Sequence, residues 1–351
     1  MKYEQKSKSH IFLIIIAVAF LAFVAWFLLS PTPSAFIVRL VFESDNYTKR
    51  VAMEELTKNS TVRVVSDISY QDTDSRSKLD VYIPQETTGN NVPLPVIIWT
   101  HGGGWLSGDK ADPAPYFKLL ADKGFVVVAP NYTLTPGQKY PYQLHQLNAA
   151  HKFIIDHASD YNIDPSKIVL AGSSAGAQIS AQFAALITDP AYALEVDIVP
   201  AIQPNQMAAT VLYCGIYDFQ TFARRDNISN WVIHWGVGVT TWSLFGSRSS
   251  EDALLSQASP LHNLTSAFPP TFISGGNADP LTTSQSVPFS NKLQTLGVDT
   301  ITLYYPDDHE PRHPHDNQFI LDEDGLANLQ SMTDFLRTRL ANSHAVAFPE
   351  G

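Results

Sequence analysis

Residues 167–188 read KIVLAGSSAGAQISAQFAALIT, and this stretch decides the fold class. Residues 167–171 form an apolar run that predicts a buried strand, and residues 175–188 follow with the pattern of an apolar helix. Between them, residues 172–176 form a G-x-S-x-G sequence, whose glycines permit a tight turn from strand to helix. Such a turn would lift the hydroxyl of Ser174 into the open. Ser174 is therefore the candidate nucleophile.

Strand-like and helix-like segments alternate along most of the chain after residue 61. Strands are predicted at residues 62–68, 79–83, 95–100, 125–129, 167–171, 210–214, 271–274 and 300–305. Helices are predicted between most of the later runs, at residues 115–123, 143–159, 175–188, 284–296 and 322–340. This alternation predicts an α/β fold with a parallel sheet covered on both faces. The first two strands have no helix between them, which predicts an antiparallel edge.

A glycine-rich segment, HGGGW at residues 101–105, follows another predicted central strand. Consecutive glycines expose backbone N–H groups, and such donors stabilise the oxyanion of a tetrahedral intermediate. We expect the amides of Gly102 and Gly103, together with that of Ala175, to form an oxyanion hole. His101 is a weaker candidate for a catalytic base, because a histidine here more plausibly holds the glycine loop by hydrogen bonding.

A nucleophilic serine also needs a base and a carboxylate that orients the base. Asp279 lies just beyond the strand predicted at residues 271–274, where sites on such sheets form. We predict that Asp279 is this acid. Asp218, which follows the preceding strand, is the alternative, and Asp279 could instead only cap the helix that follows it.

Three histidines in the segment YPDDHEPRHPHDNQF, residues 305–319, compete for the role of base. His315 lies nearest the final predicted helix, and Phe319 could pack beneath the loop. We predict His315, with His309 second and His313 third. No metal site is predicted, because a loop broken by prolines offers no helix to align the imidazoles.

The N-terminal segment differs from the rest of the chain. Residues 11–29 contain nineteen residues without a charge, close to the roughly 20 that a helix needs to cross a bilayer. They predict a transmembrane anchor. A cleaved signal peptide is the alternative, but the apolar region of a signal peptide is about 7 to 15 residues long and therefore shorter than this segment. Lysines precede this span, so the positive-inside rule places residues 1–10 in the cytoplasm and the catalytic domain outside it.

Four further segments complete the predicted organisation. Residues 30–60, opened by two prolines, are expected to be a tether, residues 61–341 the main domain, and residues 342–351 a tail. Between residues 219 and 259 the alternation of strands and helices lapses. The aromatic residues of this insertion include Trp231, Trp235, Trp242 and Phe245. The insertion is either a cap over the carboxyl ends of the strands or an ordinary helix whose aromatic stripe lies in the core.

The composition excludes several classes of function. The chain has 351 residues, of which 44% are hydrophobic and 16% are charged, so it is not a disordered protein. Its 23 basic and 34 acidic residues give a net charge of −11, and nucleic acid is therefore not an expected partner. The single cysteine, Cys214, can form neither an intrachain disulfide nor a thiolate metal cluster. No phosphate-binding motif is visible, and we expect no cofactor.

The motifs together resemble those of the alpha/beta-hydrolase superfamily, specifically the carboxylesterases similar to hormone-sensitive lipase. They are HGGGW, PNYTLTP, GSSAG, GGNADPL and a histidine-bearing loop before a last helix. The resemblance covers roughly residues 61–340 and implies an eight-stranded, mostly parallel sheet, no cofactor, and hydrolysis of carboxylic esters through an acyl-enzyme. The sequence departs from the usual motifs of this family at two places. The usual G-D-S-A-G reads GSSAG here, and the usual short His-Gly-Phe after the last strand is replaced by DDHEPRHPHDNQF.

The sequence thus predicts a membrane-anchored serine esterase or lipase that cleaves a small-molecule or lipid ester. Trp105 and Tyr132 are candidate walls of its acyl pocket. A serine peptidase on the same fold would use the same residues, but the chain has no β-rich propeller-like domain that favours it. A hydrolase fold that only binds partners is the third interpretation, although such a module need not keep nucleophile, glycine loop and acid together.

Overall fold

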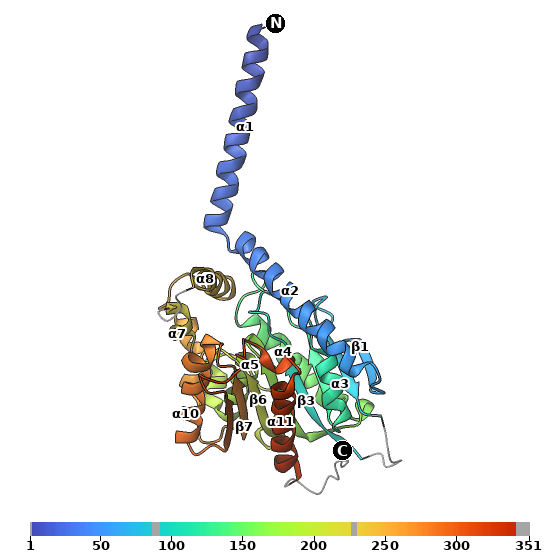
Figure 1. Cartoon of the computed structure of the whole chain (residues 1–351). Helices are drawn as coiled ribbons and strands as arrows, with labels where there is room; N and C mark the ends of the chain where they lie inside the picture. Colours follow the sequence, from blue (N-terminus) through green and yellow to red (C-terminus); the bar gives the residue numbers. More distant parts are fainter. Residues whose placement is uncertain (1, 86–91, 226–229, 342–351) are drawn as a thin grey trace.

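Eight strands form one sheet in the order β1-β2-β4-β3-β5-β6-β7-β8 (Figure 1). The structure, a computed structural model, describes residues 2–85, 92–225 and 230–341. The tail expected at residues 342–351 lies outside this range. The strands are β1 (Arg63–Ser69), β2 (Lys78–Ile83), β3 (Leu94–Thr100), β4 (Val126–Pro130), β5 (Ile163–Ser173), β6 (Met207–Tyr213), β7 (Thr271–Gly275) and β8 (Thr300–Tyr304).

The pairing of the strands confirms the predicted sheet. β1 pairs antiparallel with β2, and β2 pairs antiparallel with β4. All the other neighbours pair parallel, as strands joined by helical crossovers do. The carboxyl ends of β3, β5, β6 and β7 therefore meet at the same edge of the sheet.

Helices cover both faces of the sheet. One apolar core includes side chains of α4 (Tyr142–Asp156), α5 (Ala175–Thr188) and α10 (Val287–Thr295), and a second includes those of α3 (Ala114–Asp122) and α11 (Glu323–Ala341). Strand β5 contributes Ile168 and Leu170 to the first core and Val169 and Ala171 to the second. Because both faces of β5 are buried, its sequence is continuously apolar rather than alternating.

The segment after the apolar span is a helix, so the expected tether at residues 30–60 is wrong. Helix α1 (Lys2–Leu29) ends before Pro31, and α2 (Thr32–Thr57) begins directly after it and runs along the domain (Figure 1). A helix tolerates proline in its first turn, because an N–H group there would have no acceptor within the helix. Ala35, Val38 and Met53 of α2 are buried, which is why this segment packs on the domain.

The apolar part of α1, His10–Leu29, is not buried against the domain. It is long and apolar enough to cross a membrane, and a signal sequence would have the same properties. A buried core helix is excluded by this exposure.

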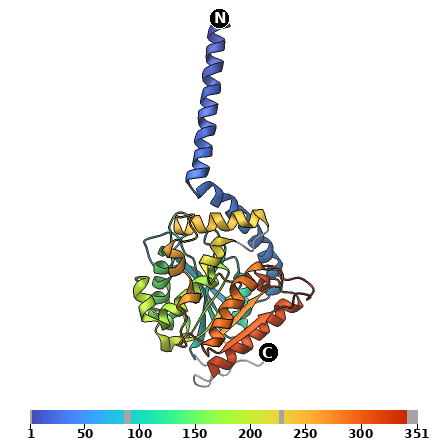
Figure 2. The same ribbon diagram turned by 90° about the vertical axis from the view of Figure 1, so that its left-hand side faces the viewer.

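The insertion between β6 and β7 forms three helices, α7 (Phe219–Arg224), α8 (Trp231–Phe245) and α9 (Ala253–Gln257). Helix α8 lies across the end of the domain from which α1 projects (Figure 2). Its C-terminal part is buried, and Phe245 packs on Tyr140 and Phe219. Its N-terminal part is not core, because Trp231 is 79% exposed. The insertion thus combines both of the alternatives that the sequence left open.

Candidate active site

Ser174 occupies the turn between β5 and α5, where its backbone adopts φ 53° and ψ −121°. This conformation is strained for a residue with a side chain. The turn is held by the Ser174 amide, which donates to the carbonyl of Tyr213 over 2.8 Å. A Cβ atom on Gly172 would collide with Gly176, and one on Gly176 would collide with Thr100, so only glycine fits at either position.

The structure brings Ser174, Asp279 and His315 together. The Nε2 atom of His315 lies 2.9 Å from Oγ of Ser174, and its Nδ1 atom lies 2.7 Å from Oδ2 of Asp279. The other carboxylate oxygen of Asp279 accepts a hydrogen bond of 2.9 Å from the amide of Leu281, so Asp279 also caps the turn that follows it. Both distances to His315 lie within the range that a base needs to its nucleophile and to its orienting acid.

The competing residues have other partners. His309 and His313 place their Nε2 atoms 2.8 and 2.9 Å from the same oxygen, Oδ2 of Asp324. Asp218 caps α7 by accepting from two of its amides, and it faces His262 at 3.4 Å. None of these three residues contacts Ser174 in the described part of the chain.

The glycine loop lies beside the serine. A Cβ atom on Gly102 would be 3.3 Å from Cβ of Ser174, which shows how closely the loop backbone approaches this serine. Gly103 has φ +97°, and a side chain there would collide with Ser107. Ala175 is the first residue of α5, so its amide has no acceptor within the helix. The backbone of Gly102 and the free amide of Ala175 thus lie next to Ser174, and the oxyanion hole stays a prediction.

His101 and Tyr132 support the glycine loop from beneath. Nδ1 of His101 donates to the carbonyl of Gly102 over 2.8 Å, and the imidazole stacks on the ring of Tyr132 with the centroids 4.3 Å apart. Burial, with a smaller contribution from Arg76, lowers the pKa of His101 to about 4, so the ring is neutral at pH 7. Tyr132 is fully buried, and its hydroxyl donates to the carbonyl of His101. The prediction that Tyr132 lines the acyl pocket is therefore wrong.

A cavity of about 710 Å³ opens onto Ser174 and His315. Trp105 is one of its lining residues. Most of its other apolar walls come from α2 and α8, namely Val38, Val41, Phe42, Val232, Ile233, Trp235 and Val237. Its volume is within the range of about 300 to 1,000 Å³ that is typical of small-molecule sites.

Comparisons with known proteins agree with this architecture. Residues 79–293 match the BD-FAE family. The chain belongs to the BD-FAE family. An esterase of Gibberella moniliformis is 31% identical over 216 residues, which are 60% of this chain and 64% of the relative. Esterase LipQ of Mycobacterium tuberculosis is 28% identical over 240 residues, which are 68% of this chain and 54% of the relative.

Solved structures share the fold of this BD-FAE member. Esterase B of Lactobacillus rhamnosis superposes with a TM-score of 0.72 at 17% identity, covering 89% of this chain and 98% of that one. An esterase of Pyrobaculum calidifontis gives a TM-score of 0.66 at 22% identity, covering 88% and 94%. The predicted alpha/beta-hydrolase fold is confirmed. The chain spans about three fifths of the length of the curated relatives that it matches first.

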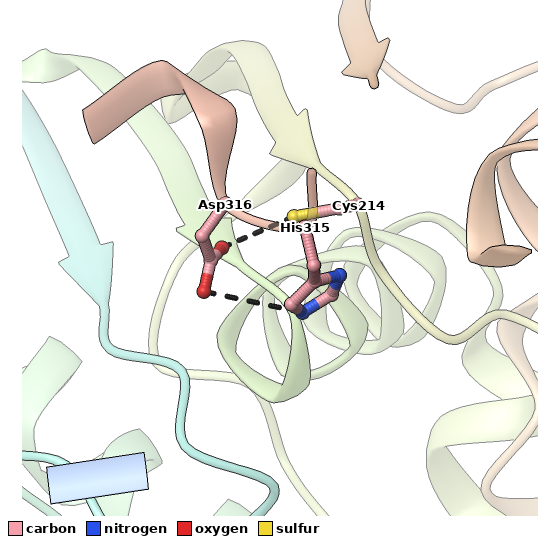
Figure 3. A group of neighbouring side chains, drawn as sticks. All are labelled: Cys214, His315 and Asp316. Carbon is pink, nitrogen blue, oxygen red and sulfur yellow. Dashed lines mark hydrogen bonds and ion pairs between the residues drawn. The ribbon is translucent and has the colours of Figure 1, made fainter. Parts of the chain in front are cut away.

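A cysteine and a second carboxylate lie next to His315 in this BD-FAE member (Figure 3). The thiol of Cys214 donates to Oδ1 of Asp316 over 3.1 Å, and Oδ2 of Asp316 lies 3.9 Å from Nε2 of His315. Burial raises the pKa of the Cys214 thiol to about 12, so at neutral pH the sulfur is protonated and is a poor nucleophile and metal ligand.

Two groups of side chains bring potential metal ligands within 4.8 Å of one another. One group is Cys214, His315 and Asp316, and its thiol is protonated. The other is His309, His313 and Asp324, where the carboxylate accepts hydrogen bonds from both imidazoles. These hydrogen bonds hold the pKa of Asp324 below its usual value. The structure therefore gives both groups hydrogen-bonding roles.

The surroundings of His315 shift its protonation. Burial is the largest single influence and lowers the pKa of His315, whereas Cys214, Asp279 and Asp316 beside the imidazole each raise it. The net effect is a pKa well above the usual 6.5. A general base must be neutral to accept a proton, so activity should rise as the pH increases through this raised pKa.

Asp316→Asn should shift the acidic limb of the pH profile of kcat/KM toward lower pH. The amide keeps the size of the carboxylate but removes a negative charge 3.9 Å from Nε2 of His315, so the imidazolium loses stabilisation. The profile for a soluble p-nitrophenyl ester measures this. Asp308→Asn, at an exposed carboxylate of the same loop, is the matched control and should leave the limb in place. A limb that stays in place or moves upward in Asp316→Asn would contradict this account of His315.

Two residues that position the histidine loop escaped the sequence analysis. Asn277 holds the loop backbone by three hydrogen bonds. Its Oδ1 accepts one of 2.8 Å from the amide of His313, and its Nδ2 donates to the carbonyls of Pro306 and His309. Lys49 of α2 donates from Nζ to the carbonyl of His315 over 3.3 Å. Asn277 lay within the GGNADPL motif and could have been noticed, whereas nothing near Lys49 indicated its role.

Lys49→Met should lower kcat by about tenfold for a soluble ester and leave KM nearly unchanged, since a hydrogen bond to a charged group contributes about 1.5 to 3 kcal/mol. The methionine keeps the apolar stem and removes only the ammonium group that holds the His315 carbonyl. Lys58→Met, at the exposed end of α2, is the matched control. Steady-state kinetics with a thermal unfolding curve for each variant make the comparison. Equal kinetics in the two variants would show that α2 does not position the base.

Proposed function

We propose that this chain is a carboxylic ester hydrolase that acts through an acyl-enzyme on Ser174. One observation carries the proposal: the imidazole of His315 lies within hydrogen-bonding distance of both the Ser174 hydroxyl and the Asp279 carboxylate. The glycine loop beside Ser174 and the apolar cavity in front of it support the same conclusion. Relatives that are named as esterases, among them those of Gibberella and Mycobacterium, also support it.

The proposed reaction begins when neutral His315 accepts the proton of Ser174 through Nε2 as Oγ attacks the ester carbonyl. Asp279 holds the tautomer with hydrogen on Nδ1 and stabilises the imidazolium that forms. The amides of Gly102, Gly103 and Ala175 stabilise the oxyanion. His315 then protonates the leaving alcohol, and the acyl group stays on Ser174. Water, deprotonated by the same imidazole, releases the acid and restores the serine.

Release of p-nitrophenol from a graded series of acyl esters tests this function. The chain starting at Pro31 keeps α2, which packs on the domain, and lacks the apolar span. We expect an initial burst of one p-nitrophenol per active site with a slowly deacylating ester, followed by steady turnover. The matching p-nitroanilides should be poor substrates. Hydrolysis of the anilides at rates comparable to the esters would favour a peptidase, and no release from either series would overturn the proposal.

We also propose that α1 is a retained anchor with its N-terminus in the cytoplasm and the catalytic domain on the other side. The uncharged, unburied segment His10–Leu29 and the lysines before it support this orientation. The full chain should stay with membranes after extraction by high salt or carbonate. A mature N-terminus near Phe36 in the native protein would show instead that the segment is a cleaved signal.

A further inference from the structure

Large apolar side chains are exposed on the first turns of α8. Trp231 is 79% exposed and Trp235 is 37% exposed, and Val232 and Ile233 between them are also exposed. Single exposed apolar residues are common on soluble proteins, but a contiguous group that includes two tryptophans marks an interaction surface. Tryptophan is also the residue that concentrates at the interface between a bilayer and water.

This group lies at the end of the domain where the apolar span leaves it. Figures 1 and 2 both show α8 next to the base of α1. Arg248, just after α8, donates to the carbonyl of Leu28 in the last turn of α1 over 2.8 Å, and its guanidinium lies 3.6 Å from the ring centre of Trp242. The C-terminal end of α8 is thereby tied to the base of the span.

The first turns of α2 continue the same apolar character. This helix follows the span after only two residues and packs against α8. The exposed apolar side chains of its first turns include Phe36, Ile37 and Leu40. We call these three residues, together with Trp231, Val232, Ile233 and Trp235, the span-side surface.

The catalytic cavity opens through this surface. Val232, Ile233 and Trp235 line the cavity and are also exposed, so they mark its mouth. Val38 and Phe42 of α2 line the cavity from within, and the cavity extends from these helices to Ser174. A chain of methylene groups that entered between α2 and α8 would therefore stay in apolar surroundings until it reached the nucleophile.

The charges around the cavity are compatible with an ester that is tethered to a polar headgroup. Arg224 and Arg225 line the cavity, although the whole chain has a net charge of −11. Among the described residues that line the cavity, Asp279 is the one with a carboxylate, and this carboxylate faces His315. Cationic side chains next to a bilayer are attracted to anionic lipid phosphates.

We infer that the span-side surface rests on the bilayer that α1 crosses, and that the substrate is a long-chain lipid ester which enters the cavity from this leaflet. The inference rests on the proposed esterase function and on the retained anchor. The occupant of the surface is a phospholipid leaflet. A surface of this kind would otherwise expose its tryptophans to water at a place that the span holds close to the membrane.

A spin label measures the docking without any catalysis. Cys214 is buried and so does not compete for the label. Trp231→Cys places a nitroxide on the span-side surface, and Val199→Cys places one at an 88% exposed position before the amino end of β6, at the opposite end of the sheet from the site. Both variants of the full chain are reconstituted in phosphatidylcholine vesicles, and collisions with oxygen and with a water-soluble nickel chelate are measured.

We expect the label at position 231 to collide with oxygen and to be shielded from nickel, and the label at position 199 to behave as a group in water. Equal exposure of both labels to nickel would overturn the docking. Shielding of position 231 that persists in detergent micelles without vesicles and depends on protein concentration would identify a second copy of the chain as the occupant, which also overturns it.

Turnover tests the substrate class separately. Trp231→Asp should lower the rate on a long-chain monoacylglycerol embedded in phosphatidylcholine vesicles by about tenfold, because it replaces a large apolar side chain that leaves water on docking with a charged one that does not. It should leave the rate on dissolved p-nitrophenyl acetate unchanged, because Trp231 does not line the cavity. Val199→Asp is the matched control for both substrates. Hydrolysis of the dissolved ester without hydrolysis of the embedded lipid would overturn the lipid substrate, whereas failure with both esters despite a shielded label would overturn the esterase function.

Discussion

Ser174→Ala is expected to lower kcat/KM for p-nitrophenyl butyrate by about 10⁴- to 10⁶-fold. The serine occupies the strained turn between β5 and α5 and is the hydroxyl that His315 reaches at 2.9 Å. Alanine removes this hydroxyl but keeps the backbone, the glycine loop and the cavity. The remaining rate would come from binding and oxyanion stabilisation alone. Stopped-flow or overnight assays of the purified variant measure a loss of this size.

Ser173→Ala is the matched control, because Ser173 is the neighbouring buried serine of the same motif. It should keep most of the activity. Thermal unfolding of both variants should stay close to that of the wild type, since neither change empties a large core volume. A fluorophosphonate probe should label the wild type and Ser173→Ala. Labelling of Ser174→Ala at the same rate would show that another residue is the nucleophile.

The strands could be located from the sequence because each is a short apolar run bounded by turn residues. Burial on both faces made β3, β4 and β5 conspicuous. Helix α2 was not recognised, because its prolines suggested a break and most of its side chains are exposed or partly exposed, so no apolar face was evident. Which of its residues are buried depends on elements distant in sequence, among them α3 and α8.

The residues of the site likewise fall into those that the local sequence indicates and those that it does not. Ser174 and Asp279 could be predicted because each lies at a turn that its own neighbours define. Tyr132 was misjudged because an aromatic residue after a strand can face the cavity or the loop, and local sequence does not distinguish the two. Lys49 acts on a loop 266 residues away, and no local pattern records such a contact.

The histidine loop shows why tertiary structure was needed to separate three similar candidates. His309, His313 and His315 occur in one irregular segment with almost the same neighbours. The selection is made by Asp324 at the start of α11, which binds His309 and His313, and by Asn277, which holds the loop backbone. Asp324 follows His313 by 11 residues and Asn277 precedes His309 by 32, so both partners lie outside the segment that carries the three histidines.

His315→Ala should abolish hydrolysis about as completely as Ser174→Ala, because residues that act as one unit have strongly non-additive effects. The imidazole is the group that contacts both Ser174 and Asp279, so its removal leaves the serine without a base. The double variant should be no slower than either single variant. Steady-state kinetics on all three, with the pH raised to test for hydroxide acting in place of the base, measure this.

The comparison with the neighbouring histidines decides the assignment. His309→Ala should keep activity within about tenfold of the wild type, because it removes one hydrogen bond to a partly exposed carboxylate. His313→Ala should mainly lower the melting temperature, since His313 is buried between Tyr305 and Asp324 and its loss leaves a cavity. If His309→Ala were the inactive variant while His315→Ala kept most of the rate, the base would lie four residues after Tyr305, and the geometry around Ser174 would not be the catalytic one.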